Sequence, residues 1–161
     1  MINPDELLPV SHIRLDELYQ SQKRVFEALA SLLADDELGG EESTRIFETL
    51  IARERLGCTA IGHGIAIPHG RIPGLSAPRA AMIRLRKGID FNAPDHSPVD
   101  LIFALIAPEG DDHLHLKILA SLARTLSEPR NREALRNAQT PERAQAVIVE
   151  QMTTVNPEQS T

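Results

Sequence analysis

Four of the six histidines of this chain lie in two short segments whose residues suit group-transfer chemistry. In the first segment, residues 62–70, His69 follows Pro68, which restricts φ and has no N–H, and precedes Gly70, which leaves space in front of the ring. This pattern predicts a histidine at the end of a rigid strand, open to a reactive group on a partner protein. A histidine that only covers the edge of the core fits the same residues.

The second segment, residues 111–116, begins with two aspartates and predicts the start of a helix. If Asp111 caps this helix, His113 lies in the first turn, where free N–H groups and the helix dipole attract phosphate and disfavour a charged imidazole. A neutral His113 is then able to hydrogen-bond to His69 or to a phosphoryl oxygen. His115 lies about 200° further round the helix, at about 100° per residue, so we give it at most a supporting place. A histidine tolerated at an exposed helix start is the alternative.

Three further side chains near the first segment carry groups that can meet an anion or act as a nucleophile. Arg53 ends a predicted helix, and its guanidinium suits a phosphoryl group, although the helix dipole alone explains an arginine there. Thr59 can offer a hydroxyl to the same anion or can simply fill a strand position. We expect Cys58 to be a small buried residue rather than a nucleophile, because nothing in the sequence stabilises a thiolate.

Hydrophobic spacing places these residues on a mixture of helices and strands. It predicts helices that begin at Ser21, Ser43, Asp111 or Asp112, Pro129 and Pro141, with Gly57 ending the second, and strands at 58–61, 65–67, 80–85, 89–91 and 101–107. The continuous apolar run 101–107 is typical of a central strand that is covered on both faces. The fourth helix has a predicted main apolar stripe of Leu116, Leu119, Ala120, Ala123 and Leu126, widened by Leu114, Ile118 and Leu122.

This order of elements predicts the fold class and the domain organisation. We expect a single domain over residues 1–152, an α/β or α+β sandwich in which helices flank a mixed β-sheet. The polar residues 153–161 are expected to form a flexible tail.

The composition points away from several other classes of protein. The net charge is −6, with four Phe, one Tyr and no Trp, which argues against non-specific nucleic-acid binding. The N-terminus has no basic region followed by an apolar run, and no apolar stretch approaches the roughly 20 residues that span a bilayer. With one cysteine and no sign of an oxidising compartment, the sequence predicts a cytoplasmic protein without membrane insertion.

Residues 53–70, with the sequence RERLGCTAIGHGIAIPHG, closely resemble the signature of the mannitol/fructose-type enzyme IIA domain of the phosphotransferase system. Residues 113–116, HLHL, followed by two Leu-Ala pairs, resemble its second motif. The resemblance extends from about Leu15 to Val149 and implies a mixed sheet flanked by helices.

The resemblance also implies roles for individual residues. His69 is the phosphorylated residue, modified on Nε2 as a tele-phosphohistidine, and His113 is the second active-site histidine, which helps to position the phosphoryl group. Arg53 matches an arginine near the site, and Thr59 belongs to the same neighbourhood. His63 stands where relatives often carry Asn, which leaves it as a candidate supporting residue. No cofactor or metal is implied.

The stand-alone domain and the runs GCTAIG and HLHL resemble the nitrogen-regulatory branch of the family. Members of that branch receive phosphate from an HPr-like phosphocarrier in a chain that starts at phosphoenolpyruvate. Their phosphorylation state then sets which regulatory target proteins they bind, among them proteins of nitrogen and potassium balance such as potassium transport or sensor proteins.

Three other functions remain open on the sequence. One is a sugar-specific enzyme IIA that feeds a fructose or mannitol permease, and another is an interaction module whose histidine no longer turns over. The third is a metal-dependent hydrolase using His63, His69, His113 and His115, although they include no His-x-x-x-His pair and no clearly placed carboxylate.

Overall fold

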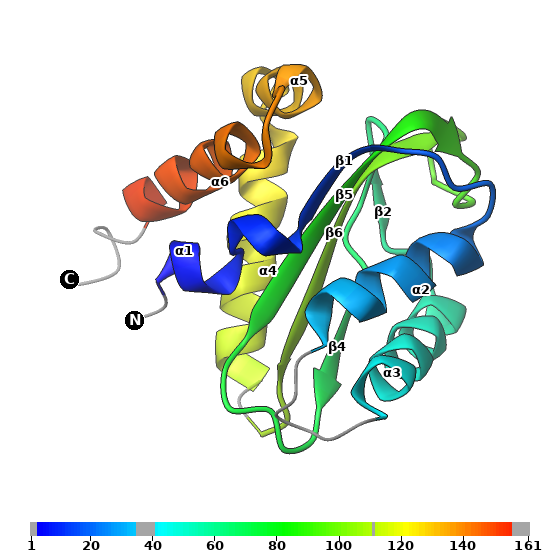
Figure 1. Ribbon diagram of the computed structural model, residues 1–161, viewed down its shortest axis with the longest axis vertical. Helices are drawn as coiled ribbons and strands as arrows, with labels where there is room; N and C mark the ends of the chain where they lie inside the picture. The colour runs from blue at the N-terminus through cyan, green and yellow to red at the C-terminus, as the bar shows by residue number, and fades with distance from the viewer. Residues whose placement is uncertain (1–2, 35–40, 111, 156–161) are drawn as a thin grey trace.

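The computed structural model describes residues 3–34, 41–110 and 112–155, in which helices cover both faces of a mixed six-stranded sheet (Figure 1). The elements in chain order are α1 (Pro4–Leu7), a 3₁₀ turn (Val10–His12), β1 (Ile13–Glu17), α2 (Gln22–Leu33), α3 (Glu42–Leu56), β2 (Ala60–Gly62), β3 (Ile65–Ala66), β4 (His69–Ile72), β5 (Arg79–Ile89), β6 (Val99–Pro108), α4 (Asp112–Ser127), α5 (Pro129–Asn137) and α6 (Pro141–Val155). The strand order is β1-β5-β6-β3-β2, and β4 pairs with β6 beyond the end of β3.

The central strand β6 contacts the helical layers on both faces of the sheet. It runs antiparallel to β5 and parallel to β3 and β4. Its buried side chains alternate: residues 101, 103 and 105 pack with α4, α5 and α6, while residues 102, 104 and 106 pack with α2 and α3. The predicted central strand over 101–107 is therefore confirmed. Figure 1 shows α2 and α3 on one side of the sheet and α4 with α6 on the other.

Several predicted helix ends are confirmed, and one is wrong. The Ser21 side chain accepts a hydrogen bond from Arg24 N at the start of α2, and the Gly57 N–H closes α3 on the Glu54 carbonyl. Ser43 does not cap α3, because the helix already begins at Glu42, whose carboxylate is buried in an ion pair with Arg79 of β5. The two prolines expected in first turns are the first residues of α5 and α6.

The strands differ from the predictions in two respects. β1 and β4 were not predicted, because each is short and carries charged or polar residues on an edge of the sheet. The predicted strand 80–85 is part of the longer strand β5, which continues to Ile89 with a register shift against β6 between Arg84 and Ile89, and residues 90 and 91 of the predicted strand 89–91 lie beyond its end. Helix α6 continues to Val155, past the predicted start of the tail at residue 153, and residues 156–161 and Asp111 lie outside the described part. No helix in the described ranges is long and apolar enough to cross a membrane.

Candidate functional site

A groove of about 850 Å³ lies beside β4, between α3 and α4. On one edge β4 pairs with β6, and no other strand of the described residues pairs with it. The groove is lined by residues of four segments, among them Arg53 and Leu56 of α3, His69 and Arg71 of β4, Glu109 of the loop between β6 and α4, and His115 and Leu116 of α4. Two helices from opposite faces of the sheet therefore meet at one strand.

The close approach of α3 to β4 requires Gly70. A Cβ added at Gly70 would lie 2.7 Å from Cγ2 of Thr49 on α3, too near for a normal contact. Gly70 and the buried Ile72 thus face α3. Because side chains alternate along a strand, His69 and Arg71 face the α4 side.

The orientation of the His69 ring is fixed by its own backbone. Nδ1 of His69 lies 2.8 Å from the carbonyl oxygen of Ile67, and a carbonyl can only accept, so Nδ1 carries the proton and donates. Ile67 is held in turn, because its N–H donates to the Thr59 carbonyl at 3.0 Å. In the neutral ring, Nε2 is consequently the nitrogen that keeps a free lone pair.

The second histidine beside His69 is His115, and the expectation that His113 takes this place is wrong. The rings of His69 and His115 have centroids 5.4 Å apart and are tilted by 47°. His115 is 7% exposed, and its buried Nδ1 has no hydrogen-bond partner in the part of the chain described. His113 is exposed and does not line the groove.

The error lies in the predicted rotation of α4. Its buried residues are His115, Ile118, Leu122, Thr125 and Leu126, whereas Leu116, expected on the main stripe, is 62% exposed. The spacing 115, 118, 122, 125 is as regular as the predicted one, so periodicity alone could not choose between them. With this rotation the helix turns His115 toward β4.

Both histidines are set to be neutral near pH 7. Burial lowers the pKa of His69, and Arg53 adds to the decrease, against the opposing hydrogen bond to Ile67 and the charge of Glu54. Burial likewise lowers the pKa of His115, with further decreases from His69 and Arg71. A neutral imidazole has the lone pair that a nucleophile needs.

Arg53 reaches the groove, and Thr59 does not. An Nη1 hydrogen of Arg53 is donated to the Gly57 carbonyl at 2.9 Å, which holds the guanidinium at the end of α3. The Thr59 hydroxyl donates to Glu54 Oε2 at 2.6 Å, and its N–H donates to Oε1 of the same carboxylate. Thr59 is buried and fixes the chain between α3 and β2, outside the groove lining.

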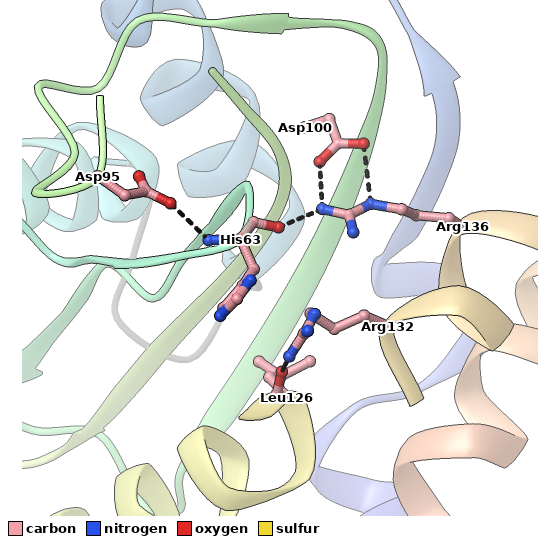
Figure 2. Close-up of polar contacts among 6 residues, drawn as sticks. All are labelled: His63, Asp95, Asp100, Leu126, Arg132 and Arg136. Carbon is pink, nitrogen blue, oxygen red and sulfur yellow. Dashed lines mark hydrogen bonds and ion pairs between the residues drawn. The ribbon is translucent and has the colours of Figure 1, made fainter. Parts of the chain in front are cut away.

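His63 precedes β3, whereas His69 follows it, and Figure 2 shows the polar contacts of His63 with Asp95 and Arg136. Its N–H donates to Asp95, and its carbonyl accepts from Arg136, which also binds Asp100 through two nitrogens. His69 pairs with Leu105, five residues along β6 from Asp100, which is about 16 Å at about 3.3 Å per residue. The structure thus separates His63 from His69.

Two other sequence-based expectations concern reactive or ligating side chains. Cys58 is exposed rather than buried, and its Sγ–H donates to the Phe91 carbonyl at 3.1 Å. The expectation of burial was based on the lack of any thiolate-stabilising group in the sequence, and that lack does not decide whether the side chain is buried. Within residues 3–34, 41–110 and 112–155, no group of three or more His, Cys, Asp or Glu is arranged to hold a metal ion.

Arg71 and Glu54 are site residues that the sequence analysis missed. Arg71 lines the groove and forms an ion pair with Asp112, and Glu54 lies close enough to raise the pKa of His69. Arg71 could have been found from the period of two residues along a strand, had β4 been recognised.

The family model of the "Phosphoenolpyruvate-dependent sugar phosphotransferase system, EIIA 2" matches residues 6–151. The chain belongs to this EIIA family. It is 39% identical over 150 residues to the nitrogen regulatory protein of Pseudomonas aeruginosa, covering 93% of this chain and 97% of that protein. It is 41% identical over 128 residues to the nitrogen regulatory protein of Bradyrhizobium diazoefficiens, and the match covers 80% of this chain and 78% of that protein.

Among solved structures, nitrogen regulatory protein IIA-Ntr from Neisseria meningitidis superimposes with a TM-score of 0.84 at 42% identity. The match covers 89% of this chain and 97% of that one. As an EIIA protein, the chain is a phosphotransfer component of the phosphotransferase system.

Proposed function

We propose that this EIIA protein accepts a phosphoryl group on Nε2 of His69 from an HPr-like phosphocarrier. The observation that carries the proposal is the hydrogen bond from His69 Nδ1 to the Ile67 carbonyl, which leaves Nε2 unprotonated beside an open groove. The relay that we propose is cytoplasmic, because it begins with phosphoenolpyruvate.

The step is a transfer between two imidazole nitrogens. The lone pair of His69 Nε2 forms the new N–P bond while the P–N bond of the carrier's phosphohistidine breaks, and that electron pair returns to the carrier's ring. The His69 ring gains positive charge as the bond forms. The Nδ1–H donated to Ile67 stabilises that charge, and the transfer needs no metal or small cofactor.

We assign the phosphoryl oxygens to groups that already line the groove. Arg53 supplies a guanidinium at the end of α3, and His115, in place of His113, supplies a ring beside His69. The start of α4 brings the positive end of its dipole to the same groove. Thr59 acts indirectly, since it fixes the turn behind Arg53, and His63 is assigned no contact with the phosphoryl group.

We further propose that the phosphorylated and free forms bind different regulatory targets, as in the nitrogen-regulatory branch. The identity of about 40% to nitrogen regulatory proteins supports this branch. Leu56 and Leu116 are 86% and 62% exposed at the groove rim, where a protein partner can cover them. Phosphorylation adds about −1.5 to −2 charges between them, enough to change the choice of partner.

The test is intact-mass analysis after incubation with phosphoenolpyruvate, enzyme I and an HPr-type carrier. Wild type should gain one acid-labile phosphoryl adduct, and His69→Ala should gain none, because it lacks the accepting nitrogen. His96→Asn, an exposed histidine in a left-handed backbone conformation that Asn tolerates, is the matched control and should be labelled like wild type. Labelling of His69→Ala at the normal rate would refute the assignment.

If the adduct forms, genetics separates regulation from sugar supply. A deletion strain that loses growth on one sugar alone would support a permease-linked role. Altered control of nitrogen or potassium balance would support the regulatory role.

A further inference from the structure

We propose that Arg71 is a phosphoryl ligand and that Asp112 holds it only while His69 is unphosphorylated. Phosphorylation would then exchange the Asp112 carboxylate for the phosphoryl group as the partner of Arg71. This inference rests on the proposed phosphorylation of His69.

Geometry places Arg71 within reach of the group. It follows His69 by two residues on β4, so both side chains leave the same face of the strand and line the same groove. Its Nη1 forms an ion pair with Asp112, the first residue of α4. The side chains of Arg71 and Asp112 are 48% and 67% exposed, which leaves them free to exchange partners.

Charge favours the exchange. Asp112 offers one negative charge, whereas a phosphoryl group offers about −1.5 to −2 charges and three acceptor oxygens to the five N–H donors of a guanidinium. The same phosphoryl group repels Asp112. Arg71 and Asp112 both lie close enough to His115 to affect its charge state, because Arg71 lowers the pKa of His115 and Asp112 raises it.

Arg71 also has a freedom that Arg53 lacks. Among the described residues that line the groove, these two carry guanidinium groups, and Arg53 already donates to the Gly57 carbonyl at the end of its own helix. The partner of Arg71 is a side chain on a different element, so the exchange disrupts no backbone hydrogen bond.

The exchange changes the surface charge of the phosphorylated protein at a second place besides the phosphoryl group. Asp112 loses its partner at the start of α4, one turn before the exposed Leu116. A regulatory partner docked on this rim would meet a new free carboxylate as well as the phosphoryl group.

The experiment measures the equilibrium of phosphoryl exchange between the HPr-type carrier and the full chain by intact mass. Arg71→Ala should lower the equilibrium constant by about tenfold, with Arg71→Lys in between, because a charged hydrogen-bond partner of the product is lost. Asp112→Asn should raise it by about threefold, because the competing carboxylate is removed. Arg24→Ala and Glu27→Gln are the matched controls, an exposed ion pair on α2, and should match wild type.

Opposite shifts for the two members of one ion pair are the signature of competition. An equal decrease of the equilibrium constant in Arg71→Ala and Asp112→Asn would mean that the ion pair only supports the fold. An Arg71→Ala equilibrium constant equal to that of wild type would show that Arg71 does not bind the phosphoryl group. If Arg71→Ala fails to fold, Arg71→Lys and Asp112→Asn decide the question by the sign of their shifts. Failure of wild type itself to take up phosphate would instead refute the proposed function.

Discussion

In the pair formed by His69 and His115, burial favours the neutral form of both rings, and a hydrogen bond sets the tautomer of His69. Burial lowers the pKa of both, and the Ile67 carbonyl fixes the proton of His69 on Nδ1. Neutral rings suit nucleophilic attack, yet they make the folded protein sensitive to acid. In the unfolded chain a histidine binds a proton with a pKa near 6.5, so the unfolded state takes up more protons as the pH falls below about 6.5.

We predict that the protein loses stability on acidification and that part of this loss depends on His115. Stability rises with pH wherever the unfolded state binds more protons, so it should be fully present above about pH 6.5 and decline below it. His115→Gln should flatten that decline, because it removes one buried titrating ring. Urea unfolding at several pH values measures the effect.

A non-titrating change at the same helix face serves as the control. Ile118→Val, also buried on α4, should cost about 0.5 to 1.5 kcal/mol at every pH alike. An unchanged pH dependence in His115→Gln would show that this ring does not titrate differently in the two states.

At the scale of elements, the site depends on how closely α3 packs on β4. The missing Cβ of Gly70 lets Thr49 approach, and this contact sets where the end of α3 brings Arg53 and Leu56 to the groove. Thr49 has little room to yield, because its side chain is β-branched and its hydroxyl donates to the Arg45 carbonyl.

Gly70→Ala should therefore destabilise the protein by about 1 to 3 kcal/mol through overpacking and should slow phosphorylation of His69. The additional change Thr49→Ser removes the Cγ2 that the new methyl group meets and should restore most of both losses. Thermal unfolding and the rate of adduct formation report the two effects. A double variant no better than Gly70→Ala would place the strain elsewhere.

At the scale of the molecule, arginines of β5 tie both helical layers to the sheet. On one face Arg79 donates to the Leu33 carbonyl at the end of α2 and pairs with Glu42 at the start of α3. On the other face Arg84 donates to the Leu135 and Ala138 carbonyls at the end of α5. Each guanidinium satisfies carbonyls that the helix itself leaves free.

Loss of the buried Glu42 carboxylate should lower the free energy of unfolding of the protein. Glu42 and Arg79 have side chains 2% and 10% exposed, so Glu42→Ala removes a buried ionic partner of the Arg79 guanidinium and should cost about 3 to 5 kcal/mol. Glu27→Gln, in an exposed pair, should change stability by less than about 0.5 kcal/mol. Urea unfolding measures the free energy of unfolding of both variants. Similar losses in Glu42→Ala and Glu27→Gln would contradict the view that the arginines of β5 hold the helical layers to the sheet.

Local signals in the sequence predicted much of the fold. Ser21, Gly57 and the two first-turn prolines act through atoms within a few residues, so their positions could be inferred without tertiary contacts. The apolar run of β6 likewise required burial on both faces. The short edge strands β1 and β4 were missed, because their pairing depends on β5 and β6 rather than on their own composition.

The motifs in the sequence are enough to identify this chain as an EIIA protein and His69 as its candidate phosphoryl acceptor, since each motif consists of residues that are adjacent in the chain. The folded structure was needed to see that His115 rather than His113 lies beside His69, that Arg71 pairs with Asp112 and that His63 lies elsewhere. The rotation of a helix and the register of a strand are set by packing against residues far away in the chain. Neighbouring residues in the sequence do not specify that packing.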